Sequence, residues 1–263
     1  MNTFFKLNRF VALCLIPLAL SSFSNNPAVS QEAQALEFSV LQQLPHSQQN
    51  FTQGLFFYDG NLYESTGQYG RSKLIRYDKD FSTPLMARSV AAKYFAEGAT
   101  AHNGVIYQLT WQAEIALAYE PRRLSKREGF SYQGQGWGLS SDGEHLWLSD
   151  GTSTLKKLGT DGAVLSSINI SMNEVPLERL NELEWVNGKI YANRWYDNRI
   201  YVIEPSSGMV THYLNLDSLA KPELADGQEN VLNGIAWNPD TETLWITGKN
   251  WRYLFELKLA EHR

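Results

Sequence analysis

The stretch "RLNELEWVNGKIYANRW" (Arg179–Trp195) contains a short apolar strand, an Asn-Gly turn and a second strand that leads to a tryptophan. Asn-Gly between two apolar runs is a strong signal for a tight β-hairpin, because both residues tolerate positive φ. Four further stretches share this pattern: "FTQGLFFYDGNLYESTG" (51–67), "FAEGATAHNGVIYQLTW" (95–111), "GQGWGLSSDGEHLWLSDG" (134–151) and "VLNGIAWNPDTETLWITGK" (231–249). The chain is therefore built from five related hairpins.

The spacing of the hairpins predicts the fold class. Their second strands align on an aromatic residue, at Tyr63, Tyr107, Trp147, Tyr191 and Trp245, with intervals of 44, 40, 44 and 54 residues. A strand-like run and a turn follow each hairpin. A repeat of about forty residues with about four strands is typical of one β-propeller blade. We therefore predict an all-β, five-bladed β-propeller. A β-sandwich is the alternative, but it would explain the turns without the period.

The ends of the chain bear on how the ring closes. The last unit stops after its third strand, whereas "LEFSVLQQLP" (36–45) alternates like a strand before the first unit. We expect this N-terminal strand to complete the last blade and so leave no unpaired edge. Residues 31–263 then form a single domain. Only residues 173–179 and 218–225 have a mildly helical pattern.

Residues 1–30 resemble a signal peptide. Two basic residues precede an apolar run, Phe10–Leu20, which is too short to span a bilayer comfortably. Small residues at 28–30 suit cleavage before Gln31. This predicts an exported chain, periplasmic or secreted, that has no membrane contact after cleavage. A retained membrane anchor is the alternative.

Charge and cysteine content exclude several classes of function. Loss of residues 1–30 removes two positive charges and changes the formal net charge from −5 to −7, which is unfavourable for binding nucleic acid or an anionic membrane. Cys14 is the only cysteine, so the mature chain has no disulfide and no thiolate nucleophile. The five histidines lack metal-ligand spacing. We expect a monomer without cofactor or catalytic metal. A structural cation in the channel is compatible with this expectation.

Equivalent positions of a propeller repeat form rings around its axis. The position before the repeated glycine, or its equivalent, is occupied by Gln53, Glu97, Trp137, Asn181 and Asn233. The end of the second strand contributes Thr66, Trp111, Asp150, Trp195 and Lys249. Three tryptophans around one carboxylate indicate a binding site, whereas a water-filled polar channel is the structural alternative. Glu182 and Glu184 share one strand face, and holding Asn181 or Arg194 is as plausible for them as chemistry.

The motifs resemble those of a known family. "FTQGL", "YESTG", "QLTW", "GWGL", "NELE", "ANRW", "VLNGIAW" and "TGKNW" occur in order across residues 37–259 and are similar to those of the plant and bacterial type of glutaminyl-peptide cyclotransferases. The resemblance implies a five-bladed propeller that converts the N-terminal glutamine of peptides to pyroglutamate and releases ammonia. "FAEG" (95–98) departs slightly, because the family more often has Gly before the Glu.

The resemblance also implies residue roles. It assigns the catalytic acid to Glu97 and does not bring a catalytic zinc. Substrate contacts carry over to Gln53, Trp111, Trp137, Asn181, Trp195 and Lys249. We further expect Lys249 and Asn181 to take part in catalysis, and Glu182 and Asn233 to contact the substrate. Peptides or proteins with N-terminal glutamine are the expected partners.

Two other functions remain compatible with these residues. A metal-dependent, lactonase-like propeller would hold a cation through Glu97, Asn181 and Asn233. A non-catalytic propeller would bind a peptide or glycan on the tryptophan rim. Sensitivity to chelators distinguishes the first from a cyclotransferase, and ammonia release from a Gln-initiated dipeptide distinguishes the second.

Overall fold

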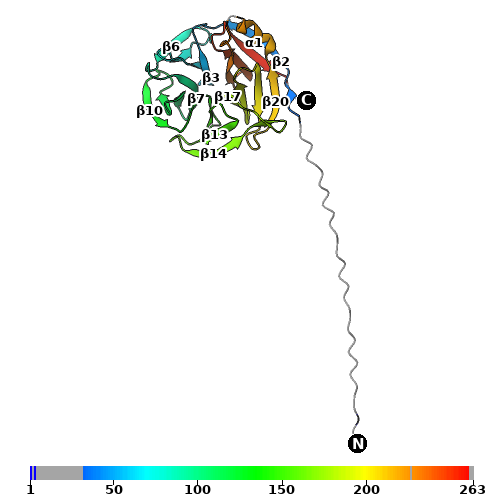
Figure 1. The fold of residues 1–263 in the computed structure, drawn as a ribbon. Coiled ribbons are helices and arrows are strands. Elements are labelled where there is room, and N and C mark those ends of the chain that lie inside the picture. The colour runs from blue at the N-terminus through cyan, green and yellow to red at the C-terminus, as the bar shows by residue number, and fades with distance from the viewer. Residues whose placement is uncertain (2, 4–31, 226, 261–263) are drawn as a thin grey trace.

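The computed structural model describes residues 1, 3, 32–225 and 227–260. Five sheets surround one axis, and the strands of each sheet lie side by side in order from the axis to the rim (Figure 1). This arrangement is a five-bladed β-propeller, which confirms the fold class predicted from the repeats. The expected signal peptide lies outside the described residues, except for positions 1 and 3.

Each blade has four main strands, given below from blade 1 to blade 5. Blade 1 consists of β3 (Thr52–Tyr58), β4 (Asn61–Thr66), β5 (Lys73–Tyr77) and β6 (Pro84–Ser89). Blade 2 consists of β7 (Ala96–His102), β8 (Val105–Thr110), β9 (Ile115–Tyr119) and β10 (Lys126–Ser131). Blade 3 consists of β11 (Leu139–Ser141), β12 (Leu146–Ser149), β13 (Thr154–Leu158) and β14 (Val164–Asn169). Blade 4 consists of β17 (Leu180–Val186), β18 (Lys189–Arg194), β19 (Arg199–Ile203) and β20 (Val210–Asn215). Blade 5 consists of β21 (Leu232–Asn238), β22 (Thr243–Gly248), β23 (Tyr253–Leu259) and β2 (Phe38–Pro45).

The N-terminal segment joins two blades. β2 pairs antiparallel with β23, so the first long strand of the chain lies beside the last one. β1 (Gln34–Ala35) adds in parallel to β20 at the outer edge of blade 4. The innermost strands β3, β7, β11, β17 and β21 contact one another in sequence, and β21 also contacts β3.

The repeated aromatic residue of each hairpin packs against the next blade. Tyr63 of blade 1, for example, shares a buried cluster with Ile106 of blade 2. The equivalent clusters form around Tyr107, Trp147, Tyr191 and Trp245. Each of the five interfaces between blades therefore contains one repeated aromatic side chain, and burial of such a large apolar surface stabilises the contact. The repeat in the sequence reflects this repeated interface.

Elements outside the blades are small. α1 (Asp217–Leu224) contains all but the last residue of the expected helical segment 218–225, but the helix expected at 173–179 is absent. A short hairpin of β15 (Ser171–Met172) and β16 (Val175–Pro176) begins this region, and positive φ at Asn173 and Glu174 forms its turn. Within the described residues, no helix has the length and apolar character needed to cross a membrane.

Candidate active site

Irregularities in the innermost strands turn the first predicted ring of side chains toward the axis. The pairing register shifts between Thr52 and Gly54 in blade 1, and the equivalent shifts in blades 2, 4 and 5 span residues 96–99, 180–183 and 232–235. Such β-bulges re-aim a side chain away from the regular alternation. Each bulge contains one member of the ring predicted from the sequence. In blade 3, Trp137 instead precedes β11.

Glycines next to the ring allow neighbouring blades to approach closely. A Cβ atom on Gly54 would lie 2.6 Å from the backbone nitrogen of Ala99, and a Cβ atom on Gly98 would lie 2.6 Å from that of Leu139. Both φ angles lie outside the left-handed region, so the constraint is steric. The backbones on either side of Glu97 are therefore in direct contact, which fixes the position of this residue.

A cavity of about 200 Å³ lies beside the residues of the first ring. We call it the axial cavity. Seven of the nine predicted site residues line it: Gln53, Glu97, Trp111, Trp137, Asn181, Trp195 and Lys249. The fold thus brings together residues from all five blades. Phe51, Phe95 and Glu229 also line the cavity but were missed in the sequence. A signal for the two phenylalanines was present, since each stands two residues before a ring position and strand side chains alternate.

Glu97 and Lys249 are the ionisable groups at the base of the cavity. Both are about 5% exposed. Burial raises the pKa of the Glu97 carboxyl well above its usual range, while the charge of Lys249 acts in the opposite direction. Burial likewise lowers the pKa of Lys249, opposed by Glu97. Neither forms an ion pair with a described residue, so both remain available to a substrate.

Aromatic rings form the walls. The ammonium nitrogen of Lys249 lies 4.7 Å from the ring centre of Phe51 and 5.8 Å from that of Trp195, within cation–π range. The ring of Trp195 meets Trp137 edge to face at 5.6 Å. On the other side, Trp111 meets Phe95 at 5.8 Å. The cavity therefore has an apolar lining around two buried ionisable groups, Glu97 and Lys249.

Gln135 connects two of the wall tryptophans. The indole N–H groups of Trp111 and Trp137 both donate to its side-chain oxygen, each at 2.9 Å. One amide thus sets the orientation of both rings. Gln135 stands two residues before a ring position, in the same relation as Phe51 to Gln53.

Two buried polar atoms in the lining have no hydrogen-bond partner within the described part of the chain. They are the side-chain oxygen of Asn181 and the indole nitrogen of Trp195. Buried polar groups are nearly always paired in native proteins. One unpaired acceptor and one unpaired donor in the same cavity lining are consistent with a ligand that supplies both partners.

Glu182 and Asn233 do not line the cavity. Glu182 follows the ring residue Asn181, at the position where the other blades have glycine, and its carboxyl accepts from the backbone N–H of Leu55 in blade 1 at 3.3 Å. Asn233 donates to the side-chain oxygen of Gln53 at 3.1 Å. Asn233 therefore orients a lining residue, and Glu182 links innermost strands of different blades.

Glu184 and the remaining members of the second ring also have structural contacts. The carboxyl of Glu184 accepts from the backbone N–H of Trp237 at 2.8 Å, and Asp150 pairs with Lys156 at 3.0 Å. Thr66 bonds to the backbone of the neighbouring strand. None of these three lines the cavity.

A buried network supports the cavity from blades 1 and 5. The Glu64 carboxylate accepts from His46 at 3.1 Å and from the Thr52 hydroxyl at 2.7 Å. Burial alone would lower the pKa of His46, but the Glu64 charge and hydrogen bond raise it overall. The Thr52 hydroxyl is also 3.2 Å from the backbone oxygen of Gly248. Since Thr52 precedes Gln53 and Gly248 precedes Lys249, the network holds both parts of the site.

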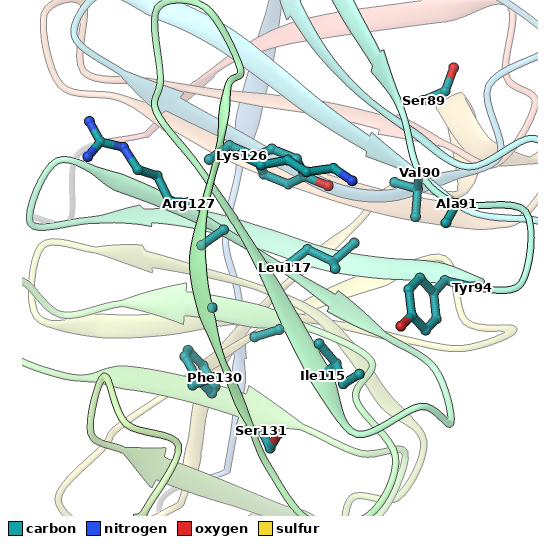
Figure 2. Close-up of a pocket in the computed structure, with 14 residues that line it drawn as sticks. Ser89, Val90, Ala91, Tyr94, Ile115, Leu117, Lys126, Arg127, Phe130 and Ser131 are labelled. Carbon is teal, nitrogen blue, oxygen red and sulfur yellow. The ribbon is translucent and has the colours of Figure 1, made fainter.

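A second cavity lies between the outer strands of blades 1 and 2 (Figure 2). Its volume is about 310 Å³, and its wall includes Tyr94, Leu117, Lys126 and Arg127. No Asp, Glu or His side chain lines this cavity. It therefore has no carboxylate or imidazole to accept a proton, whereas the axial cavity contains the buried Glu97 and seven of the predicted residues, so the axial cavity is the candidate active site.

Comparisons with known proteins identify the family of the chain. The sequence matches the glutamine cyclotransferase family over residues 12–259. It is 36% identical over 231 residues to the glutaminyl-peptide cyclotransferase of Arabidopsis thaliana, a match that covers 86% of this chain and 72% of the relative. The fold is similar to the crystal structure of Myxococcus xanthus glutaminyl cyclase, with a TM-score of 0.82, 31% identity, and coverage of 88% of this chain and 100% of that one.

Proposed function

The chain belongs to the glutamine cyclotransferase family and acts as a glutaminyl-peptide cyclotransferase, and we propose that the axial cavity is its active site. The α-amine of an N-terminal glutamine attacks the side-chain amide carbon of the same residue. A five-membered lactam, pyroglutamate, forms and ammonia leaves. The observation that carries the proposal is one buried carboxyl group, Glu97, in a cavity with aromatic walls.

The first task of the site is to hold the glutamine side chain curled toward its own amine. Both reacting groups belong to one residue, so catalysis depends on selecting a near-attack conformer. Trp111, Trp137 and Trp195 supply flat apolar walls for the methylene groups. The hydrogen bonds that Trp111 and Trp137 donate to Gln135 keep two of these walls in place.

The second task is to move one proton. The attacking nitrogen loses a proton as the ring closes, and the departing nitrogen gains one to leave as ammonia. We assign this relay to Glu97, which accepts the first proton and donates the second. The raised pKa of its carboxyl suits the donation step, and the nearby Lys249 charge favours the carboxylate needed for the acceptance step.

The third task is to stabilise the tetrahedral intermediate. Lys249 and Gln53 offer donors for the developing oxyanion, and a donor of this kind is typically worth about 3 kcal/mol. Asn181 presents an unpaired side-chain oxygen, so its role is to accept a hydrogen bond from the substrate amine or amide. Asn233 acts indirectly by orienting Gln53.

Ammonia release from a Gln-Ala dipeptide tests this assignment. Wild-type protein is expected to release ammonia, and Glu97→Gln is expected to fold normally but lose nearly all turnover. Circular dichroism of both proteins controls for folding. Turnover by Glu97→Gln near the wild-type rate would remove Glu97 from the mechanism.

We also propose that the protein is exported, that residues 1–30 are its signal peptide, and that the mature enzyme is a monomer that binds no nucleic acid. The apolar run with preceding basic residues supports export, and the net negative charge is unfavourable for binding nucleic acid. The chemistry is proposed to need no metal. Activity that is unchanged after EDTA treatment is the expected result, and activity restored only by an added cation would contradict it.

A further inference from the structure

Two loops from different blades meet at the mouth of the cavity. Tyr196 follows β18 in blade 4, and Glu229 precedes β21 in blade 5. The Tyr196 hydroxyl donates to a carboxylate oxygen of Glu229 at 2.5 Å. The ring of Tyr196 also stacks on Trp195, with 4.6 Å between ring centres. The carboxylate of Glu229 is therefore held in a defined place beside a wall of the site.

Tyr196 is held in an unusual backbone conformation. Its φ angle is +61°, in the left-handed region that a bulky residue rarely adopts. Residues in such conformations persist only when the surroundings fix them, and they concentrate at functional sites. The stacking on Trp195 and the bond to Glu229 are the contacts that fix this side chain.

Within the described part of the chain, Glu229 acts on the charge of Lys249 only through space and makes no direct ion pair with it. Among the described residues, Glu229 forms no ion pair with Lys or Arg, and its side chain is exposed. Lys249 lies deeper in the same cavity and is almost fully buried. A negative charge thus faces the entrance, where it is free to interact with a ligand that enters.

The position of the reaction indicates which part of a substrate meets Glu229. The reacting atoms of the glutamine must lie at Glu97, which is 5% exposed, whereas Tyr196 is 49% exposed at the rim. Consecutive Cα atoms are about 3.8 Å apart. The residue after the glutamine is therefore the first that can reach the mouth of the cavity, where the Tyr196–Glu229 pair lies.

We propose that Glu229, held by Tyr196, is a specificity-determining residue that favours substrates with Lys or Arg directly after the cyclised glutamine and disfavours substrates with Asp or Glu there. This inference rests on the proposed function of the cavity. Opposite charges attract and like charges repel across the solvent-exposed rim, and both effects weaken as salt screens them.

The test compares kcat/KM for three peptides, Gln-Lys-Ala, Gln-Gln-Ala and Gln-Glu-Ala, all amidated at the C-terminus. For the wild type we expect the order Lys, then Gln, then Glu, with roughly tenfold between the extremes at low salt. Glu229→Gln should bring the three values together. Tyr196→Phe keeps the stacked ring but releases the carboxylate, so it should reduce the ratio partially.

Glu242→Gln is the matched control. It removes the same charge from an exposed residue in the turn after β21, at the end of that strand away from the cavity. This variant should retain the wild-type ratio. Equal kcat/KM for the three peptides in the wild type would overturn the inference, as would a Glu229→Gln variant that slows all three in the same proportion.

Binding measured by tryptophan fluorescence separates the two proposals. Charge-dependent binding without ammonia release would support the role of Glu229 and overturn the active site assignment. Ammonia release without charge dependence in either assay would do the reverse.

Discussion

Glu184→Gln is expected to make the protein more stable at neutral pH. Glu184 lies on β17 with 8% of its surface exposed, and its carboxyl accepts from the backbone N–H of Trp237 at 2.8 Å. Burial raises its pKa from 4.5 to about 8. The folded protein must therefore keep a proton on this group, while the unfolded chain releases it above pH 4.5. Glutamine retains an oxygen for the Trp237 N–H and has no proton to release.

The sign and size follow from the two pKa values of Glu184. The pKa of Glu184 is higher in the folded protein than in the unfolded chain. The contribution of Glu184 to the free energy of unfolding is therefore fully present below pH 4.5 and is lost as pH rises toward about 8. Each pH unit in this window costs about 1.4 kcal/mol. At pH 7 the variant should be more stable than the wild type by about 3 kcal/mol, and the difference should vanish near pH 4.5.

Urea unfolding from about pH 5 to about pH 8 measures this difference, with the slope m checked for constancy. Burial also raises the pKa of Glu97 and Glu182. The unfolding free energy of the wild type should therefore fall with rising pH more steeply than Glu184 alone would cause. Glu242→Gln, an exposed change of the same charge, should leave the pH dependence unaltered. Stability curves for Glu184→Gln and wild type that run parallel over the whole pH range would refute the reasoning.

Three further predictions concern the site, the supporting network and the N-terminus. Trp137→Ala should raise KM for a Gln-initiated peptide more than it lowers kcat, and an unchanged KM in initial-rate measurements would count against its role as a wall. His46→Gln leaves the Glu64 charge buried without its cationic partner, so unfolding free energy should fall by about 3 kcal/mol. In the wild type, the His46 contribution is present below pH 6.5 and lost as pH rises through its raised pKa, while that of Glu64, whose pKa is lowered overall, is lost as pH falls. The exported chain should begin at Gln31, itself an N-terminal glutamine, and intact mass should show loss of one ammonia from it. A catalytically inactive variant that shows the same loss would indicate spontaneous cyclisation.

The blade count was predictable because its signals are local. Each Asn-Gly or Asp-Gly turn can be recognised without knowledge of the rest of the chain. The aromatic residue in each second strand, such as Tyr63, recurs because each interface between blades needs one. The helix expected at 173–179 was wrong because a weak pattern over seven residues competes with a tight turn, and positive φ at Asn173 and Glu174 is available to that turn.

The site was predictable only in part, because side-chain direction depends on bulges. A shift of one residue turns a strand side chain to the opposite face, and the sequence does not mark where a bulge lies. Asn181 and Glu182 are neighbours within one bulge, yet only Asn181 lines the cavity. Glu229 belongs to a loop outside the repeat, so no alignment of the five units could place it at the mouth.

The bulges also explain how blades support one another's site residues. A bulge removes ladder hydrogen bonds from the innermost strand, and the freed backbone groups need other partners. Ser65 of blade 1 donates to the backbone oxygen of Glu97 in blade 2. Ser149 of blade 3 donates to that of Asn181 in blade 4 at 2.5 Å. Each of these two residues of the candidate site is therefore positioned by a serine of the preceding blade, so a change at Ser149 in blade 3 can displace Asn181 although Ser149 does not line the cavity.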